Sequence, residues 1–364
     1  MNRGVFLKTD IIKFGENQKE NKIKLERIAD TLKDGGLVVF PTETVYGLGG
    51  NGLDKNACKK IYEAKGRPSD NPLILHIAEI KQLKELVEEI PEVAKKCMDR
   101  FWPGPLTIIF KRSKLVPNEA TGGLDTVAIR MPSNEIAHEI LKEVYLPIAA
   151  PSANLSGRPS PTETKHVVKD LKGRVDIIVD GGHSVVGIES TVLDVTVDPP
   201  MILRPGKITL EDLRKIDKNI NIDSATIDAK SGEIPKSPGQ KYKHYAPKAP
   251  AICFGGGLDK IIIEIKKNIK ENKGKKIAVL ASSESYDEYK NEGVDLLINL
   301  GSREHLEEVA TNLFSALRKC DEEEVDIIFA EGYEFRGMGL SIMNRLLKAC
   351  GGKVVMRIWG VKWK

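Results

Sequence analysis

The sequence predicts an α/β protein of two domains, the first built on a mixed sheet and the second on a doubly wound parallel sheet. The chain has 364 residues, more than the ~100–200 of one ordinary domain. Over residues 21–214, short apolar strands alternate irregularly with amphipathic helices, and the last strands have only short connections, as in a mixed sheet. From residue 251 the alternation of strand and helix becomes regular, which indicates a parallel sheet.

Apolar spacing and capping residues predict the elements of the first domain. Leu25, Ile28 and Leu32 share one face of a helix over 21–33. Asp54 can cap a short helix that ends near Ala64. The remaining elements are strands at 37–40, 73–78, 106–110, 126–131, 146–150, 175–180, 190–195 and 201–204, and helices at 79–90, 92–100, 134–144 and 162–171, the last with Thr162 as its cap.

Residues 215–250 differ in character from the rest of the chain and predict a linker. Apolar periodicity fades there, and SPGQKYKHYAPKAP (237–250) is rich in Pro, Lys, Tyr and His. We therefore expect a first domain at 1–214 and a second at 251–364. The second domain has predicted strands at 251–254, 276–282, 294–300, 325–331 and 354–359, and helices at 258–272, 303–319 and 338–350.

Composition excludes several classes of protein. The net charge of +4, from 56 Lys and Arg against 52 Asp and Glu, is too small to indicate a nucleic-acid binder. The 5 cysteines are odd in number and widely spaced, which argues against a disulfide scaffold or a CxxC metal site. We find no signal peptide and no apolar run of ~18 residues, so we expect a cytoplasmic protein without membrane contact.

Polar segments follow two of the predicted strands, at the edge where open α/β sheets bind ligands. PTETVYGL (41–48) follows the strand at 37–40, although taken alone it is more typical of a proline-led turn with exposed Thr and Glu. APSANLSG (150–157) follows the strand at 146–150. The hydroxyl of Ser152 and the amide of Asn154 suit a polar ligand. No His–Asp pair is visible that would make Ser152 a nucleophile, so the sequence predicts a binding role for it. A plain Asx or Ser/Thr turn is the alternative.

Positively charged side chains occur in three further segments. Lys65 and Arg67 flank a glycine in KGRPSDNP (65–72), and a point charge beside a planar fork suits an oligophosphate or a carboxylate. The spacing is not that of a P-loop, and a solvated basic loop at a helix end is an equal alternative. Arg130 lies in the apolar strand TVAIRM and Arg204 ends MILR. A buried arginine requires an anion, either a ligand or a protein carboxylate. His76, also in an apolar strand, is by itself more typical of a core histidine.

Taken in order, seven segments resemble one family. PTETVYGL, KGRPSDNPL, FWPGPLT, VAIRMP, APSANLSG, ESTV and ILRPG are similar to the motifs of the Sua5/YrdC/YwlC family of L-threonylcarbamoyladenylate synthases. The SPGQKYKHYAP linker and second α/β domain resemble the longer, Sua5-type members. Glu43 stands where Asp is expected, a conservative departure. The resemblance covers nearly the whole chain and implies a YrdC-like, twisted open sheet with a deep basic cavity, followed by a Rossmann-like domain.

The resemblance also implies a reaction and a set of site residues. L-threonine, bicarbonate and ATP, with Mg²⁺, would give threonylcarbamoyl-AMP and pyrophosphate. Threonylcarbamoyl-AMP would be the precursor of N6-threonylcarbamoyladenosine 37 in tRNA. The implied catalytic residues are Lys65 and Arg67. Those implied to bind L-threonine are Thr44, His76, Arg130, the backbone at Ala150, and Ser190. Those implied to bind ATP are Lys65, Arg67, Asn71, Thr126, Ser152, Asn154, Ser160, Arg204 and Tyr245, and none is assigned to a metal.

Partners and alternatives complete the expectations. A downstream tRNA-modifying transferase complex would consume the product, and direct contact with RNA stays open. A double-stranded RNA-binding or translation-associated module without catalysis is the alternative function, disfavoured by the near-balanced charge. A carbamoyl transferase of the hydrogenase-maturation type would carry zinc-binding cysteine pairs, which this chain lacks. We expect the linker at 237–247 to close over the nucleotide and exclude water. The glycine run at 255–257 predicts a turn, and 337–349 a helix packed on the second sheet.

Overall fold

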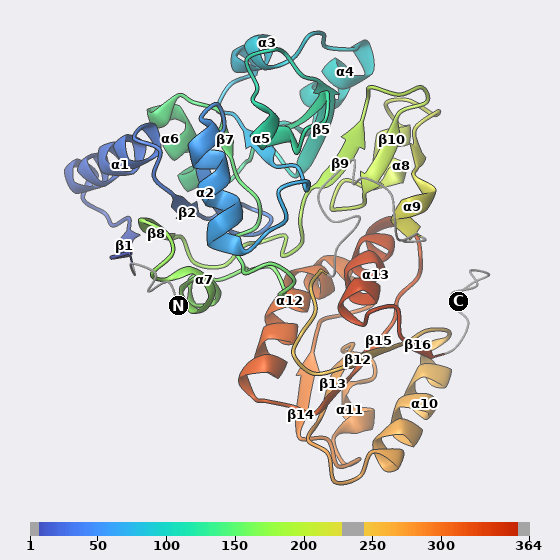
Figure 1. Cartoon of the computed structure of the whole chain (residues 1–364). Coiled ribbons are helices and arrows are strands. Elements are labelled where there is room, and N and C mark those ends of the chain that lie inside the picture. Colours follow the sequence, from blue (N-terminus) through green and yellow to red (C-terminus); the bar gives the residue numbers. More distant parts are fainter. Residues whose placement is uncertain (1–6, 228–243, 356–364) are drawn as a thin grey trace. The chain divides into compact units, whose positions relative to one another are not determined.

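The computed structural model describes residues 7–227 and 244–355, which form two compact units (Figure 1). The first unit comprises Met1–Ser156, Ser160–Val185 and Glu189–Lys241. The second comprises Tyr242–Lys364 together with two short stretches from earlier in the chain, Gly157–Pro159 and Val186–Ile188.

The first unit is built on a mixed sheet, as the sequence predicts. Parallel pairs such as β4 with β6 lie beside antiparallel pairs such as β5 with β6. Among the described residues it has 11 strands, in the order β1 (Asp10–Lys13), β8 (Ile177–Asp180), β2 (Val38–Phe40), β3 (Gly47–Asn51), β7 (Ile148–Ala149), β4 (Ile74–His76), β6 (Thr126–Arg130), β5 (Leu106–Lys111), β9 (Thr191–Asp194), β10 (Met201–Arg204) and β11 (Asn221–Ile222).

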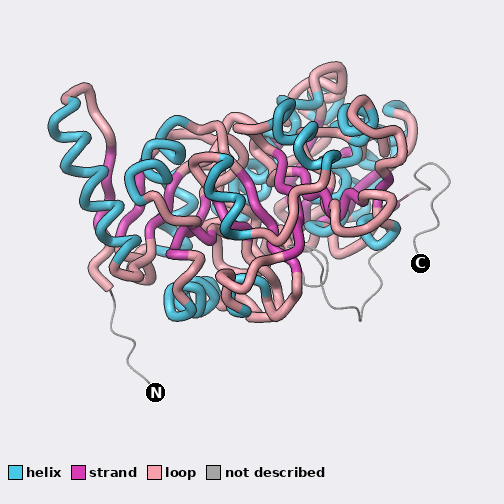
Figure 2. The backbone as a smooth tube through the Cα atoms, turned by 90° about the horizontal axis from the view of Figure 1, so that it is seen from above, coloured by secondary structure: helices cyan, strands magenta, loops and turns pink. Residues whose placement is uncertain are grey.

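Helices cover both faces of this sheet, and Figure 2 shows the strands running between them. On one face α1 (Gln18–Lys33) and α6 (Glu135–Val144) share a core with Val38 and Phe40 of β2. Val39 points to the opposite core, as strand alternation requires. The helices of that second core are α2 (Lys55–Lys65), α3 (Leu83–Leu86), α4 (Glu92–Phe101), α5 (Asn118–Thr121), α7 (Thr164–Leu171) and α8 (Leu210–Arg214).

The second unit has the parallel sheet that its regular alternation predicts. Every described strand pair in it is parallel, in the order β14 (Leu296–Asn299), β13 (Ile277–Ala281), β15 (Ile327–Glu331), β12 (Ala251–Phe254) and β16 (Val354–Val355). The helices α10 (Leu258–Glu271) and α11 (Tyr286–Tyr289) contribute to one core, and α12 (Leu306–Glu322) packs against α13 (Gly337–Ala349). The predicted strand at 354–359 continues outside the described residues.

Two local predictions for the first unit are wrong, and β3 has no counterpart among the predicted strands. The sequence GLGGN forms β3 although glycine disfavours strands, because it pairs with β2, where an added Cβ at Gly49 would lie 2.6 Å from the ring of Phe40. The predicted helix at 79–90 is only a 3₁₀ turn (Ile80–Gln82) followed by α3, because Val87 turns extended and pairs with Arg112. The cap of α7 is Glu163, one residue after Thr162. The termini of α1, α2 and α6 agree with prediction to within a few residues.

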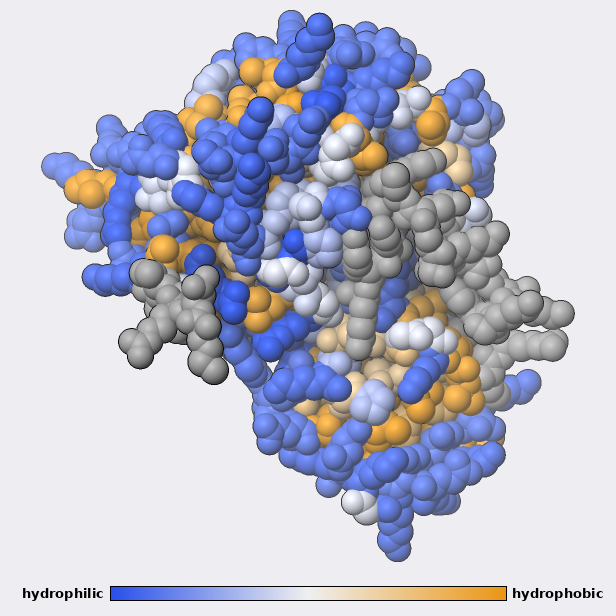
Figure 3. Space-filling view, in the orientation of Figure 1, coloured by the Kyte–Doolittle hydropathy of each residue, from blue (hydrophilic) through white to orange (hydrophobic). Residues whose placement is uncertain are grey.

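Charged and polar side chains cover much of the outer surface in Figure 3, as the 30% charged composition leads one to expect. The described residues include no helix that is long and apolar enough to cross a bilayer. All five cysteines are buried free thiols, consistent with the prediction that they form no disulfide scaffold.

Close packing of backbone against backbone makes Gly206 a test of the fold. An added Cβ there would lie 2.4 Å from the backbone nitrogen of Thr191 and 2.8 Å from the carbonyl oxygen of Glu189. We expect Gly206→Ala to lower the free energy of unfolding by about 1–3 kcal/mol, the usual cost of overpacking, as measured by urea denaturation. Gly15→Ala, where nothing lies within 4 Å, is the control. Equal unfolding midpoints for the two variants would contradict the packing argument.

Candidate active site

A buried lysine joins the end of α2 to the loop that follows β7. Asp54 caps the first turn of α2 by accepting the backbone N–H of Asn56, and Gly66 ends the helix in the left-handed conformation (φ 61°). Lys65 is 2% exposed. Its Nζ donates to the carbonyl oxygens of Ser152 and Asn154, the latter at 2.6 Å, and lies 3.4 Å from Asn154 Oδ1. The loop predicted to bind a polar ligand therefore depends on Lys65 for its position.

Within that loop, Ser152 and Asn154 contact each other as the SxN pattern suggests. Ser152 Oγ donates to Asn154 Oδ1 at 2.6 Å, and Asn154 Nδ2 donates to the Leu155 carbonyl at 2.8 Å. The backbone of Ser152 also bridges to Gly47 at the start of β3. Two of the predicted polar segments, 41–48 and 150–157, thus lie side by side.

The loop after Gly66 is ordered by its own arginine. Arg67 is half-buried, and its Nε and Nη2 donate to the carbonyl oxygens of Asn71 and Pro72 at 3.2 and 3.0 Å. Asn71 is 2% exposed, and its side-chain Oδ1 has no hydrogen-bond partner among the described residues. A buried amide oxygen without a partner is uncommon in folded proteins and is consistent with a site for a ligand donor.

Arg130 lies at the centre of the first unit's sheet. It ends β6, where it is in register with His76 on β4 and with Thr107 on β5. Strand register therefore brings together two predicted threonine-binding residues and a hydroxyl that the sequence analysis quoted only as part of FWPGPLT. These three residues lie in one row across neighbouring strands, where they could contact the same ligand.

Around the guanidinium of Arg130 the first polar segment supplies the acceptors. Nη1 donates to Thr44 Oγ1 at 2.8 Å and Nε to the Gly104 carbonyl at 3.3 Å. Nη2 lies 2.7 Å from Glu43 Oε1, with both side chains buried. The prediction of an exposed turn at 41–48 is wrong: Thr44 is 1% and Glu43 6% exposed. Desolvating Arg130 requires these neighbours to be inside with it.

Burial sets the charge states of this cluster. Burial raises the pKa of the Glu43 carboxyl, but the charge and hydrogen bond of Arg130, with the backbone N–H groups of Glu43 and Ser133, outweigh it and hold the pKa below its ordinary value. Burial, followed by the positive charge of Arg130, lowers the pKa of His76 to about 3. Its Nδ1 lies 3.1 Å from the Ile74 carbonyl and must carry the hydrogen of this contact. His76 is therefore neutral, with Nε2 as an acceptor.

A second arginine ends β10. Arg204 is 6% exposed, and it donates from Nε to the Ser190 carbonyl and from Nη2 to Ser190 Oγ, both at 3.0 Å. Ser190 Oγ and Thr107 Oγ1 share a hydrogen bond of 2.7 Å. Because Thr107 is in register with Arg130, Ser190 and Arg204 are linked to the Arg130 cluster through this hydroxyl.

The other predicted site residues lie as follows. Ser160 Oγ donates to Glu189 Oε1 at 2.5 Å, next to Ser190 in the chain. The backbone N–H of Ala150 donates to the carbonyl of Ile74. Thr126 begins β6, at the opposite end of the strand from Arg130. Tyr245 belongs to the second unit, where its ring packs 5.0 Å from that of Phe314.

Sequence reasoning gave no role to Glu43, Thr107 or Glu189, although all three lie in the quoted motifs. The resemblance marks Glu43 only as a conservative replacement of Asp. The sequence signal that could have singled it out is the presence of a carboxylate in a segment otherwise rich in small and apolar residues. Which carboxylate meets which arginine depends on strand register, which the motifs do not contain.

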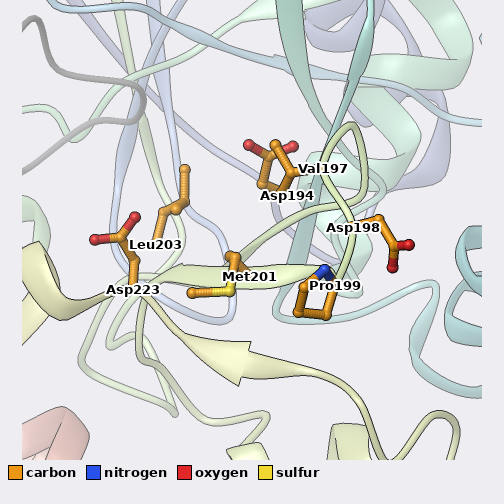
Figure 4. Close-up of a pocket in the computed structure, with 7 residues that line it drawn as sticks. All are labelled: Asp194, Val197, Asp198, Pro199, Met201, Leu203 and Asp223. Carbon is orange, nitrogen blue, oxygen red and sulfur yellow. The ribbon is translucent and has the colours of Figure 1, made fainter.

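Figure 4 shows a pocket elsewhere in the first unit, with a volume of about 220 Å³. Its lining includes the carboxylates of Asp194, Asp198 and Asp223 and none of the predicted site residues. Carboxylates repel a triphosphate, so this pocket is not the basic cavity that the sequence leads one to expect. No group of three or more His, Cys, Asp or Glu side chains able to hold a metal ion occurs in the described part of the chain.

Comparison with known proteins identifies both units. Residues 30–206 match the Sua5/YciO/YrdC family model, described as telomere recombination, and residues 208–351 match the threonylcarbamoyl-AMP synthase C-terminal domain. The threonylcarbamoyl-AMP synthase of Pyrococcus abyssi is 50% identical over 349 residues, spanning 95% of this chain and 99% of that protein. The corresponding values for the Bacillus subtilis enzyme are 49%, 340 residues, 92% and 95%.

A solved structure agrees with these relatives. The crystal structure of P. abyssi Sua5 complexed with L-threonine has a TM-score of 0.88 and 48% identity, covering 95% of this chain and 98% of that one. The match extends over both α/β units, each of which has the sheet described above. The chain therefore belongs to the Sua5/YciO/YrdC family, in the two-domain form of the threonylcarbamoyl-AMP synthases.

Proposed function

We propose that the Arg130 cluster holds L-threonine and that the loops around Lys65 and Ser152 hold ATP, for the synthesis of threonylcarbamoyl-AMP and pyrophosphate with bicarbonate as the third substrate. The observation that carries this proposal is the set of buried cations, Lys65 at the end of α2, Arg130 at the end of β6 and Arg204 at the end of β10, held by hydroxyl, carboxylate and carbonyl oxygens. Such groups bind and orient anions, and none of them is arranged as a nucleophile.

The chemistry needs positioning more than it needs a reactive side chain. The ammonium group of threonine and bicarbonate give a carbamate with loss of water and a proton. A carbamate oxygen then attacks the α-phosphorus of ATP, and pyrophosphate leaves. Holding the carbamate in line with the α-phosphorus, and offsetting charge on the phosphate oxygens, are the contributions a protein makes to such a transfer. A fork of two N–H groups on Arg130 suits the threonine carboxylate. Neutral His76 suits a hydroxyl donor.

On the nucleotide side we assign Lys65, Arg67, Asn71, Ser152, Asn154, Ser160 and Arg204, with Thr126 and Tyr245 as further contacts. Mg²⁺ would enter with ATP, since triphosphate oxygens are the hard ligands it prefers. The linker would close over the nucleotide, although 228–243 lie outside the described residues. Transfer to tRNA by a downstream complex, and a cytoplasmic location, belong to the same proposal, the latter supported by five buried free thiols.

One assay tests this function against a binding module without catalysis. Release of pyrophosphate from ATP should require both L-threonine and bicarbonate, and threonylcarbamoyl-AMP should accumulate. Double-stranded RNA binding with no threonine-dependent pyrophosphate would favour the alternative and overturn the proposal.

Arg67 offers the clearest catalytic prediction, because it lies in a loop rather than in the core. We expect Arg67→Ala to lower the rate of pyrophosphate release by about 100- to 1,000-fold, the usual effect of removing one transition-state charge contact. The matched control is Arg112→Ala, since Arg112 likewise donates to a neighbouring loop carbonyl, that of Val116 at 2.6 Å, but has no predicted role. If both variants lose activity equally, or Arg67→Ala melts well below the wild type, Arg67 is structural.

The lowered pKa of His76 predicts a pH dependence of stability. With a folded-state pKa of about 3 against 6.5 for the unfolded chain, the unfolded state binds more protons between these values. Stability from this group is therefore complete above pH 6.5 and falls as the pH drops, by up to about 1 kcal/mol per pH unit. Urea denaturation from pH 4.5 to 7 should show this slope relative to His76→Gln. The exposed His183→Gln is the control, and parallel profiles for wild type and His76→Gln would refute the assignment.

A further inference from the structure

Glu43 is a buried carboxylate with too few partners. It is 6% exposed, its Oε1 lies 2.7 Å from Arg130 Nη2, and neither oxygen makes a hydrogen bond of normal geometry with the described residues. Arg130 Nη2 likewise makes no hydrogen bond of normal geometry with the described residues. Buried polar groups are nearly always hydrogen-bonded, because leaving them bare costs their full desolvation energy.

Another carboxylate in this chain shows the contrast. Glu331, 0% exposed in the second unit, accepts from the hydroxyls of Ser282 and Tyr289 at 2.7 and 2.8 Å and from Arg303 Nη2 at 2.8 Å. It also accepts from the backbone N–H of Ser282 and from Ser285. That carboxylate is saturated by the protein. Glu43, 6% exposed, has the ion pair with Arg130, and the nearby backbone N–H groups of Glu43 and Ser133 make no hydrogen bond of normal geometry with its oxygens.

The neighbours of Arg130 limit what the missing partner of Glu43 is. Nη1 and Nε of Arg130 already donate to Thr44 and to the Gly104 carbonyl. The remaining unsatisfied atoms, Arg130 Nη2 and the Glu43 oxygens, form a cation and an anion side by side. A ligand that pairs both by charge carries an anionic acceptor and a cationic donor within a few ångströms of each other, as the zwitterion of an α-amino acid does.

We propose that Glu43 binds the α-ammonium group of the amino-acid substrate, and that its ion pair with Arg130 is the ligand-free arrangement that the substrate's zwitterion replaces. This inference rests on the proposed placement of L-threonine at Arg130. On binding, the substrate carboxylate takes Arg130, and the ammonium, with its three N–H donors, takes the oxygens of Glu43. Both protein charges stay paired throughout, so neither is left bare in the interior.

The role is recognition and not proton transfer. Because the pKa of Glu43 is held below its ordinary value, the carboxylate is ionised at neutral pH and is a weak base. Carbamate formation removes the positive charge from the nitrogen, so the contact exists with the substrate and is lost as the reaction proceeds. Removing a contact that is made only with the substrate in the ground state does not raise the barrier to the chemical step. Loss of Glu43 should therefore raise KM for threonine without lowering kcat.

The experiment compares two ligands that differ only in the amine. L-threonine and 3-hydroxybutanoate are titrated calorimetrically into the wild type, Glu43→Gln and Glu43→Asp, and KM and kcat are measured from pyrophosphate release. We expect Glu43→Gln to bind L-threonine about 10- to 100-fold more weakly, the range for a charged hydrogen bond. It should bind 3-hydroxybutanoate at least as well as the wild type does, because Arg130 is freed. Glu43→Asp, which keeps the charge, should lie between.

Asp194→Asn is the matched control. Asp194 is 5% exposed, and its Oδ1 accepts from Thr196 within its own turn, at the opposite end of β9 from Ser190. The Asp194→Asn substitution removes a buried carboxylate from the same unit without touching the site. It should leave the affinities for L-threonine and for 3-hydroxybutanoate unchanged. Circular dichroism and melting temperature check that each variant is folded. If Glu43→Gln does not fold, the test passes to Glu43→Asp and to the wild type, which must prefer L-threonine over 3-hydroxybutanoate by at least 10-fold.

Several results would overturn the inference. Equal weakening of both ligands would mean that Glu43 only holds Arg130 in place. Unchanged threonine affinity in Glu43→Gln, or a fall in kcat at constant KM, would exclude ammonium recognition. A wild-type protein that binds no L-threonine at all would instead refute the proposed function, and this inference with it.

Discussion

The burial of Arg130 in the middle of a β-sheet is the constraint on which the candidate site depends. A guanidinium out of water needs acceptors on every side, and the chain supplies them from segments far apart in sequence: Glu43 and Thr44 after β2, and Gly104 before β5. Meeting that requirement draws the first polar segment inward. Thr107 is in register with Arg130 on the neighbouring strand β5. Its hydroxyl shares a hydrogen bond with Ser190, which accepts from Arg204, so these two residues are linked to the same cluster.

This burial also decides what the residues can do chemically. In a site from which water is excluded, fixed charges and dipoles act more strongly than at the surface. His76 loses its charge and becomes an acceptor, whereas Glu43 keeps its charge because Arg130 is adjacent. The pKa values of both groups beside this arginine are lowered, which leaves His76 neutral and Glu43 ionised. Each is thus in the state that suits an amino-acid ligand: a neutral acceptor and an anion.

Much of the fold could be predicted from the sequence, because its signals are local. The cap at Asp54, the stop at Gly66 and the apolar face of α1 depend on neighbouring residues only. The failures have long-range causes. Strand β3 forms by pairing with β2, where Gly49 lies against Phe40, and the helix at 79–90 breaks because Val87 pairs with Arg112. Each of these contacts joins two separate segments, so no periodicity within one segment could reveal it.

The candidate site was predictable in the same uneven way. The motifs named the residues that now lie together, Thr44 with Arg130 and Lys65 with Ser152 and Asn154. They could not show that Arg130 meets Glu43, because this requires the register of β6 and the inward turn at 41–44. Residue type gives the chemistry available at a position, and only the fold decides which groups are left without partners.

How fully each cation is paired separates the two proposed subsites. The ammonium of Lys65 has three N–H donors, and its neighbours include three neutral carbonyl oxygens, two of the backbone and one of the Asn154 side chain. A phosphate oxygen that came within reach would replace a neutral carbonyl with a charged acceptor, which makes a stronger hydrogen bond. Lys65 would then contact the nucleotide only by releasing part of the 152–154 loop, so that ATP binding and the position of Ser152 and Asn154 would be coupled. At Arg130 the proposed exchange would be between one carboxylate and another, and the charge released on Glu43 would be available for the substrate amine. The nucleotide side would thus be organised by displacing dipoles, and the amino-acid side by exchanging ion pairs.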